Sequence, residues 1–198
     1  MRSSHFSLHV GSRALALAWA LGALLSSACT KNSQSGAEPA WTLSSADSGP
    51  LAQKSKKATE KHDAAWATCH QSVKPTGKGV EADVSALAKS CEAVTQMKRV
   101  GSTIVGKRDA ENQPQTIPFQ TEARKCYRVY AAGNATVGDL DLVIKDSNGD
   151  VVGEDSTDDP TPVLAEDGAL CFKVADAATL AVSIGAGKGS YALEIWSD

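Results

Sequence analysis

The clearest pattern in the chain is an alternation of apolar and polar residues between positions 138 and 155. Successive side chains of a β-strand point to opposite faces, so Leu140, Leu142 and Ile144 share one face of a strand. Asn148-Gly149 then supplies two residues that readily take the positive φ angles of a type I′ turn, and Val151-Val152 begins a returning strand. The pattern predicts a β-hairpin.

The same period of two continues through the chain after Ser102. Short strands separated by turn residues at intervals of about ten residues are typical of antiparallel sandwiches and barrels. We therefore expect residues 102–198 to form an antiparallel, jelly-roll-like β-sandwich. The candidate strands are Ser102–Val105, Thr116–Gln120, Lys125–Ala131, Leu140–Lys145, Asp150–Gly153, Pro162–Leu164, Leu170–Val174, Thr179–Ile184 and Ser190–Trp196.

Residues 51–101 show a helical spacing instead. Apolar residues recur three, four or seven positions apart, first in residues 51–71 and again in residues 80–94, and Pro75 and Gly77 interrupt the pattern between them. We predict an antiparallel helical hairpin over residues 51–101, which makes the fold class α+β. The residues that carry the spacing are Ala58, His62, Ala65, Trp66 and Cys69, followed by Val80, Val84, Leu87, Ala88, Cys91 and Val94.

The N-terminus has the features of a targeting segment. Arg2 and Arg13 precede an apolar run over residues 14–25, which is shorter than the roughly 20 residues that a membrane span needs. Residues 1–28 are therefore predicted to be a signal peptide. Residues 29–50 are rich in Ser, Gly, Ala and Pro without a sustained period, which predicts a flexible tether.

The signal peptide ends in L25-S-S-A-C29, which resembles the lipobox of bacterial lipoproteins. The resemblance implies that Cys29 is lipidated and becomes the first mature residue, and Thr30 after it would favour the outer membrane. The family usually has Leu three residues before the cysteine, where this chain has Ser26. Simple cleavage near Ala28 is the alternative.

Four further cysteines indicate a disulfide framework: Cys69, Cys91, Cys126 and Cys171. An even number in an exported chain predicts two disulfides, for which three connectivities exist. A Cys69–Cys91 bridge would staple the helical hairpin, although the two residues would lie about 16 Å apart along the helix axis. A Cys126–Cys171 bridge would stabilise the sandwich. A zinc site is the weaker alternative, because the chain has no C-x-x-C pair.

The net charge of −3 hides two halves of opposite sign. Residues 51–108 contain 11 Lys and Arg against 5 Asp and Glu, a net +6, whereas residues 109–198 contain 6 against 16, a net −10. This partition suggests two units with different surfaces, which attract each other or different partners. Nucleic acid is not expected as a partner, because Trp66 is the one aromatic residue of the basic half.

Acidic residues crowd the hairpin and the segment after it. Calcium prefers oxygen ligands in irregular loops, so a calcium site is one interpretation, and no other cofactor is expected. Turn formation and the protection of sheet edges account for the same residues without a metal. D146-S-N-G-D150 also departs from an EF-hand loop in the place of its glycine. The candidate ligands are Asp139, Asp141, Asp146, Asp150 and Asp155.

No catalytic constellation is visible. The chain has no G-x-S-x-G motif, and the two histidines after the signal peptide, His62 and His70, both lie in the predicted helical region. We therefore expect a protein that is not an enzyme. An unrecognised enzyme would have to use the acidic loop with a metal, with Asp139, Asp141 and Asp155 as its carboxylates.

Residues 118–198 resemble the bacterial pre-peptidase C-terminal domain. The motifs that carry the resemblance are D139-L-D-L-V-I-K-D-S-N-G149, G168-A-L-C-F-K-V174 and G185-A-G-K-G-S-Y-A-L-E-I-W196. The resemblance implies a β-sandwich that usually sits beside an exported hydrolase, and some members of the family bind matrix polymers or calcium. No protease domain accompanies these motifs in this chain.

Together these features predict a non-enzymatic, lipid-anchored protein of the cell envelope. It would be an outer-membrane lipoprotein that faces the periplasm or the cell surface, with membrane contact through the lipid alone. Its sandwich would bind an extracellular or envelope protein or a polysaccharide. The alternatives are self-association through the oppositely charged halves, or an accessory role to a separate secreted hydrolase.

Overall fold

The structure is a computed structural model that describes residues 53–155 and 157–198. The predicted signal peptide, the lipidation site Cys29 and the predicted tether over residues 29–50 lie outside the described residues. All the described residues belong to one compact unit.

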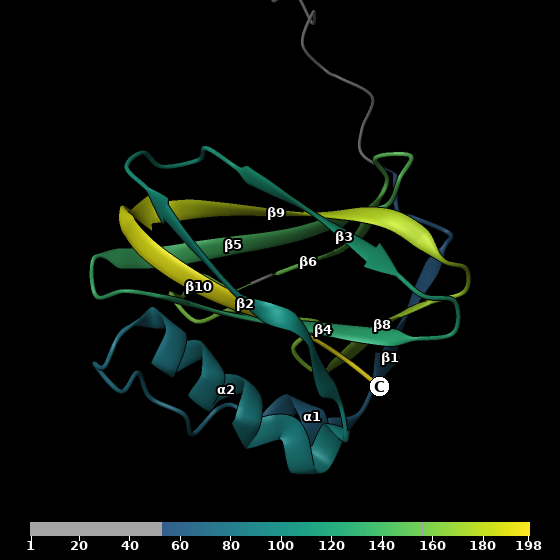
Figure 1. The fold of residues 1–198 in the computed structure, drawn as a ribbon, viewed down its shortest axis with the longest axis horizontal. Helices are drawn as coiled ribbons and strands as arrows, with labels where there is room; N and C mark the ends of the chain where they lie inside the picture. Colours follow the sequence, from purple (N-terminus) through teal and green to yellow (C-terminus); the bar gives the residue numbers. More distant parts are fainter. Residues whose placement is uncertain (1–52, 156) are drawn as a thin grey trace, which may run out of the picture. The chain divides into compact units, whose positions relative to one another are not determined.

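Two antiparallel sheets face each other in the described residues and form a β-sandwich (Figure 1). One sheet has the order β1-β8-β4-β10-β2, with β7 also paired to β4, and the other has the order β3-β9-β5-β6. The elements are β1 Ala58–His62, α1 Ala64–Thr68, α2 Val80–Thr95, β2 Lys98–Arg108, β3 Gln115–Thr121, β4 Cys126–Gly133, β5 Val137–Lys145, β6 Val151–Glu154, β7 Val163–Leu164, β8 Gly168–Phe172, β9 Asp176–Gly187 and β10 Gly189–Ser197.

The core between the sheets is built from the alternating positions that the sequence predicts. Leu140, Leu142 and Ile144 of β5 are fully buried there, and the alternate residues Leu180, Val182 and Ile184 of β9 are buried beside them. Each of the nine predicted strands is present, with bounds shifted by a few residues. The predicted antiparallel sandwich is therefore confirmed.

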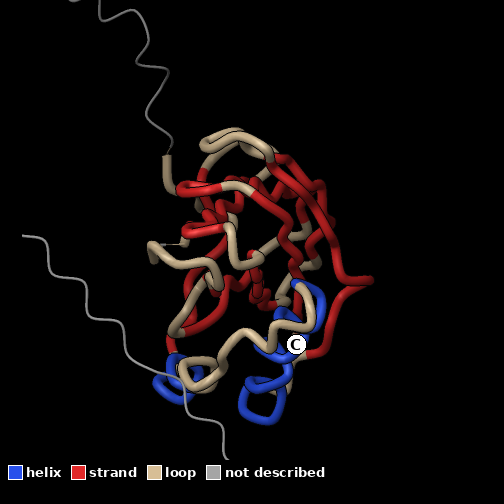
Figure 2. The backbone as a smooth tube through the Cα atoms, turned by 90° about the vertical axis from the view of Figure 1, so that its left-hand side faces the viewer, coloured by secondary structure: helices blue, strands red, loops and turns tan. Residues whose placement is uncertain are grey.

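A second apolar cluster lies on the outer face of the larger sheet, under the two helices. It joins Trp66 of α1 and Leu87 of α2 to Tyr130 of β4 and Trp196 of β10. Figure 2 shows both helices on the same side of the strands. Strand β4 is thus covered on both faces, and all eight of its residues are buried. This burial explains why its sequence is apolar almost throughout and does not alternate.

The predicted N-terminal helical hairpin over residues 51–101 is wrong, and with it the α+β fold class. Residues 58–62 form strand β1, which pairs with β8, so that α1 keeps five residues. The second predicted helix is present at nearly full length, as α2. Pairing with β8 gives β1 its backbone hydrogen bonds. This tertiary contact outweighs the helical spacing of Ala58 and His62, which is a local pattern of the sequence.

The predicted β-hairpin is confirmed by the pairing of β5 with β6, but the predicted turn type is wrong. Of the two turn residues, Gly149 alone has a positive φ, of 87°. The loop is organised by Asp146, whose Oδ1 accepts hydrogen bonds from the backbone N–H groups of Asn148 at 2.8 Å and Asp150 at 3.1 Å. The Asp146 side chain therefore organises this turn, which agrees with the turn-forming role expected of the acidic residues.

Candidate functional site

Two disulfides hold the described residues together. Cys126 of β4 and Cys171 of β8 are direct neighbours across the larger sheet and are bonded. Cys69, which follows α1, is bonded to Cys91 in α2. Disulfides of this kind indicate an oxidising, exported environment. No helix in the described part of the chain has the length and apolarity needed to cross a bilayer.

The Cys69–Cys91 bridge forms without the separation of about 16 Å along the helix axis that a helical hairpin would impose on the two cysteines. Because α1 ends at Thr68, the connection to α2 covers residues 69–79. A chain of that length spans at most about 35 Å, which is ample to run back along α2 to the level of Cys91.

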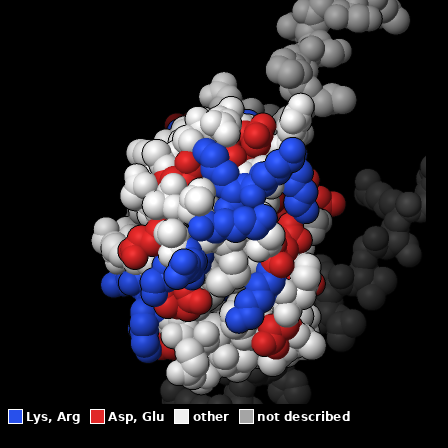
Figure 3. Space-filling view, turned by 90° about the vertical axis from the view of Figure 1, so that its right-hand side faces the viewer, with Lys and Arg blue, Asp and Glu red and all other residues white. Residues whose placement is uncertain are grey.

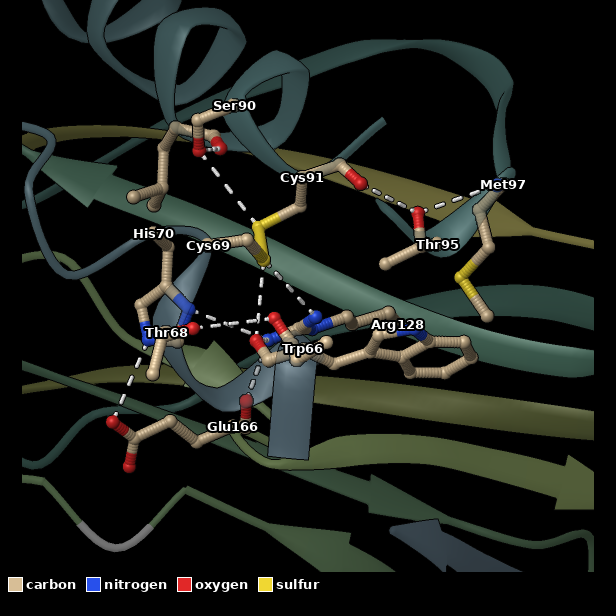
Figure 4. Close-up of a disulfide and its surroundings, with 12 residues drawn as sticks. Trp66, Thr68, Cys69, His70, Ser90, Cys91, Thr95, Met97, Arg128 and Glu166 are labelled. Carbon is tan, nitrogen blue, oxygen red and sulfur yellow. Dashed lines mark hydrogen bonds and ion pairs between the residues drawn. A yellow bond between two sulfur atoms is a disulfide. The ribbon is translucent and has the colours of Figure 1, made fainter. Parts of the chain in front are cut away.

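Arg128 lies fully buried beneath this disulfide, as the close-up in Figure 4 shows. Its Nη2 donates hydrogen bonds to the backbone carbonyls of Trp66 at 2.9 Å and Glu166 at 2.5 Å. Its guanidinium also stacks over the ring of Tyr130 at 5.3 Å. Burial lowers the pKa of Arg128 and raises the pKa of Tyr130 to about 12. The Arg128 side chain thus fastens α1 and the turn before β8 to strand β4.

His70 joins this cluster to an acidic surface. Its side chain is buried, with Nδ1 3.4 Å from the Arg128 guanidinium and Nε2 3.5 Å from a carboxylate oxygen of Glu166. Burial and the Arg128 charge lower the pKa of His70, while Glu166 acts in the opposite direction. The net effect favours the neutral form of the His70 side chain.

An open groove of about 400 Å³ lies beside this cluster, at the mouth of the sandwich. Strand β1 carries Ala58, Glu60 and His62 on the face that it shares with Leu170 of β8, because paired residues of neighbouring strands point to the same side. Ala58 packs against the core, whereas Glu60 lines the groove. The floor is closed by Gly153, where a Cβ atom would approach Leu170 to 2.8 Å.

The groove is acidic. We define it as the acidic groove by its five carboxylates, which come from β1, the end of β6 and the turn between β7 and β8: Glu60, Glu154, Asp155, Glu166 and Asp167. Its lining contains no Lys or Arg. A neighbouring hollow of about 210 Å³ shares Glu166 with it and adds His70 and Asp159.

Both histidines of the described residues contact this groove. His62 lies 3.7 Å from Glu60 and 3.0 Å from Asp167, and His70 lies against Glu166. Lys54 pairs with Glu60 from outside at 3.2 Å. Within the described residues, Glu60, Glu166 and Asp167 thus have ionisable neighbours, among which Lys54 is the one lysine.

The structure does not bring the five predicted calcium ligands together. Asp139 and Asp141 lie side by side at one end of β5, where a Cβ on Gly185 would lie 2.0 Å and 3.0 Å from their carboxylate oxygens. Asp146 and Asp150 belong to the hairpin turn, about seven residues or 23 Å further along the strand. Asp155 follows β6, lines the acidic groove and accepts hydrogen bonds from Thr157.

The Asp139 end has a feature that fits a cation. Asp139 Oδ1 is buried without a hydrogen-bond partner, and burial together with Asp141 and Asp158 raises the pKa of this carboxyl. The described residues hold one group of three with ligand atoms within 4.8 Å of one another, namely Cys69, His70 and Cys91. Because both sulfurs of that group are in a disulfide, it offers no thiolate for zinc.

Sequence reasoning missed most of the acidic groove. The helical spacing places Glu60 in a helix, and no motif points to the turn residues Glu166 and Asp167. A signal was present in A165-E-D-G168, where two adjacent acids precede a buried strand without a nearby Lys or Arg.

Comparison with known proteins finds little. No protein-family model and no curated protein matches the chain. Among solved structures, the chain is similar to the crystal structure of the pre-peptidase C-terminal domain of a collagenase from Bacillus anthracis. The identity is 13%, the TM-score is 0.38, and the match covers 48% of this chain and 87% of that chain. That domain carries the name of the family that residues 118–198 resemble, and a likeness this distant says nothing about ligands or partners.

Proposed function

We propose that the protein is an exported, non-enzymatic binding module, anchored to the outer membrane through a lipid on Cys29. Its acidic groove holds a basic, extended segment of an envelope protein. The groove is the observation that carries this proposal, because five carboxylates line it and no Lys or Arg does. The disulfides and the β-sandwich supply a rigid frame for such a site.

The strands beside the groove favour an extended ligand. β1 and β6 are edge strands of their sheets, and both contribute residues to the groove; Val151 of β6 is already hydrogen-bonded to Gln53 and Ser55, so β1 and the rest of β6 offer the free edges. Edge strands expose backbone N–H and C=O groups that pair readily with a further strand. Main-chain pairing would supply affinity, and the carboxylates would select Lys and Arg side chains.

Binding to the groove is tested with a fluorescent decalysine peptide as the probe. We expect the variant Glu60→Gln, Glu166→Gln, Asp167→Asn to bind it about tenfold more weakly than the wild type, since each exposed pair contributes about 0.5 kcal/mol. A matched control removes three carboxylates elsewhere through Glu81→Gln, Glu92→Gln and Asp109→Asn. Equal losses of affinity in both variants would show a general effect of net charge and would contradict binding in the acidic groove.

The lipid anchor is tested separately. The mass of the mature N-terminus should correspond to a lipidated Cys29, and Cys29→Ala should release the protein from membranes. Continued sedimentation of that variant with membranes would refute the anchor. Light scattering addresses the self-association alternative, which requires species larger than a monomer at low salt.

A further inference from the structure

Cations from three distant segments meet at one end of the sandwich. Lys56 and Lys57 precede β1, Arg124 and Lys125 precede β4, and Lys173 follows β8. Backbone hydrogen bonds join these segments: the N–H of Lys173 donates to the carbonyl of Lys57 at 2.8 Å, and the N–H of Arg124 donates to the carbonyl of Phe172 at 2.7 Å. We call these five residues the basic face. Figure 3 shows Lys and Arg side chains gathered in a band across this side of the molecule.

Three cations of the basic face are exposed and lie in no ion pair within the described residues. Lys57 pairs with Asp176 at 2.9 Å, and Lys125 Nζ donates to the backbone carbonyl of Asp198. Lys56, Arg124 and Lys173, in contrast, are exposed and form no ion pair within residues 53–155 and 157–198. One exposed acid, Glu122, lies in the same turn as Arg124. The face is thus available to an anionic partner.

An apolar residue stands among these cations. Val174 follows Lys173 in the turn before β9 and is 49% exposed. Ala123 and Ala175, in the same two turns, are also exposed. A lipid headgroup region accepts cations and apolar side chains together, whereas a dissolved polyanion gains nothing from the valine.

The chain enters the described structure beside this face. Gln53, the first described residue, accepts a hydrogen bond from the N–H of Val151 and lies three residues before Lys56. Cys29 lies 24 residues before Gln53, a length that spans at most about 85 Å. A lipid at Cys29 would therefore keep the basic face within reach of a bilayer.

We propose that the basic face docks on the surface of an anionic lipid bilayer, with Val174 entering the headgroup region. The contact is separate from the acidic groove. The proposal uses the lipid on Cys29 only as an aid to proximity, and the test below omits Cys29, so that failure of the anchor and failure of the face are distinguishable.

The test is sedimentation with lipid vesicles. The protein is exported behind a cleavable signal peptide so that it begins at Thr30, which keeps every described contact and both disulfides. The wild type should bind vesicles of phosphatidylglycerol and phosphatidylethanolamine at low salt, bind pure phosphatidylcholine vesicles weakly, and dissociate in about 0.5 M salt. Absence of binding to the anionic vesicles at low salt would overturn the proposal.

Charge reversal identifies the face. Lys56→Glu, Arg124→Glu, Lys173→Glu should weaken vesicle binding by about 100-fold, because each cation near an anionic surface contributes about 1 kcal/mol. The matched control Lys74→Glu, Lys78→Glu, Lys89→Glu changes three exposed, unpaired lysines elsewhere in the described residues and should keep most of the binding. An equal loss in both variants would overturn the proposal.

Two further measurements separate the apolar contact from the charges and from misfolding. Val174→Ser, which leaves the charges intact, should weaken binding by up to about tenfold, and circular dichroism of each variant should match the wild type. If the charge-reversed variant does not fold, the neutral variant Lys56→Gln, Arg124→Gln, Lys173→Gln replaces it. Binding to heparin without binding to vesicles would show a site for soluble polyanions and would also overturn the proposal.

Discussion

The two ends of strand β5 place aspartates in opposite electrostatic surroundings. At the hairpin end, Asp146 is buried and accepts hydrogen bonds from Ser55 at 2.7 Å and from two backbone N–H groups, with Lys57 at 4.0 Å. At the other end, Asp139 lies beside Asp141 and keeps a buried oxygen without a hydrogen-bond partner. Aspartate therefore organises a loop at one end of the strand, whereas two neighbouring aspartates repel each other at the other end.

The pKa shifts follow these surroundings. Burial alone would raise the pKa of Asp146, but hydrogen bonds from Ser55, Asn148 and Asp150 and the charge of Lys57 lower it overall. At Asp139, burial and neighbouring carboxylates act in the same direction and raise the pKa. An acidic stretch in a sequence is thus not one site, because each carboxylate depends on the partners that folding brings to it.

The largest effect is expected at the hairpin end. Asp146→Ala removes the acceptor of three hydrogen bonds and leaves Ser55 and the turn without their partner, so it should destabilise the fold by about 3 kcal/mol. Urea unfolding measures the change. The control Asp150→Ala, in the same turn, should stay within about 0.5 kcal/mol of the wild type. Similar values for both variants would contradict the organising role of Asp146.

The loss of folding stability at acidic pH should depend on the hydrogen bonds and ion pairs of Asp146 and Asp176. The folded pKa values of Asp146 and Asp176 are lowered, so their contribution is fully present above the unfolded pKa of about 3.9 and is lost as the pH falls through the folded values. Thermal melting between pH 6 and pH 2 should show a steeper loss in the wild type than in Asp146→Ala. Equal losses of Tm with falling pH in the wild type and in Asp146→Ala would contradict the lowered pKa of Asp146.

The sequence predicted the strands because strands such as β5 and β9 alternate buried and exposed residues, and turn residues bound the shorter or fully buried strands. It failed at β1, since A58-T-E-K-H62 becomes a strand only by pairing with β8, whose partner residues begin 106 positions later at Gly168. No local pattern records such a pairing. The helical spacing of Trp66 and Cys69 was real, but it belonged to the short helix α1 and did not extend back through residues 51–62.

The candidate site was still harder to predict, because three segments assemble it. Glu60 comes from β1, Glu154 from β6 and Glu166 from the turn before β8. The cysteines gave the number of bridges and left the pairing open, which the sheet register decides for Cys126 and Cys171. Asp139 and Asp146 look alike in the sequence, and only the fold supplies Ser55 to one of them and Asp141 to the other.

A smaller effect of opposite sign is expected at the Asp139 end. Asp139→Asn removes one of two adjacent carboxylates, so it should stabilise the fold at pH 7 by about 1 kcal/mol or less. Because the folded pKa of Asp139 is raised, the wild-type carboxyl contributes stability below about pH 3.9 and loses it as the pH rises through the folded value. The gain from Asp139→Asn should therefore vanish at pH 3. The matched change Asp150→Asn at the hairpin end should give no such gain, and an equal gain there would contradict the repulsion.

Calcium provides the smallest and most selective test of this repulsion. Asp139 and Asp141 would hold the ion with few other protein ligands, so we expect a dissociation constant in the millimolar range. At about 1 mM calcium the fold should then gain about 0.4 kcal/mol, or a rise in Tm of about 1–2 °C over the same sample with a chelator. Asp139→Asn should abolish this rise, whereas Asp150→Asn should keep it, because the hairpin turn satisfies its own carboxylate at Asp146 through hydrogen bonds. A rise that survives in Asp139→Asn would place the ion elsewhere, and the absence of any rise in the wild type would leave the two aspartates as uncompensated repulsion.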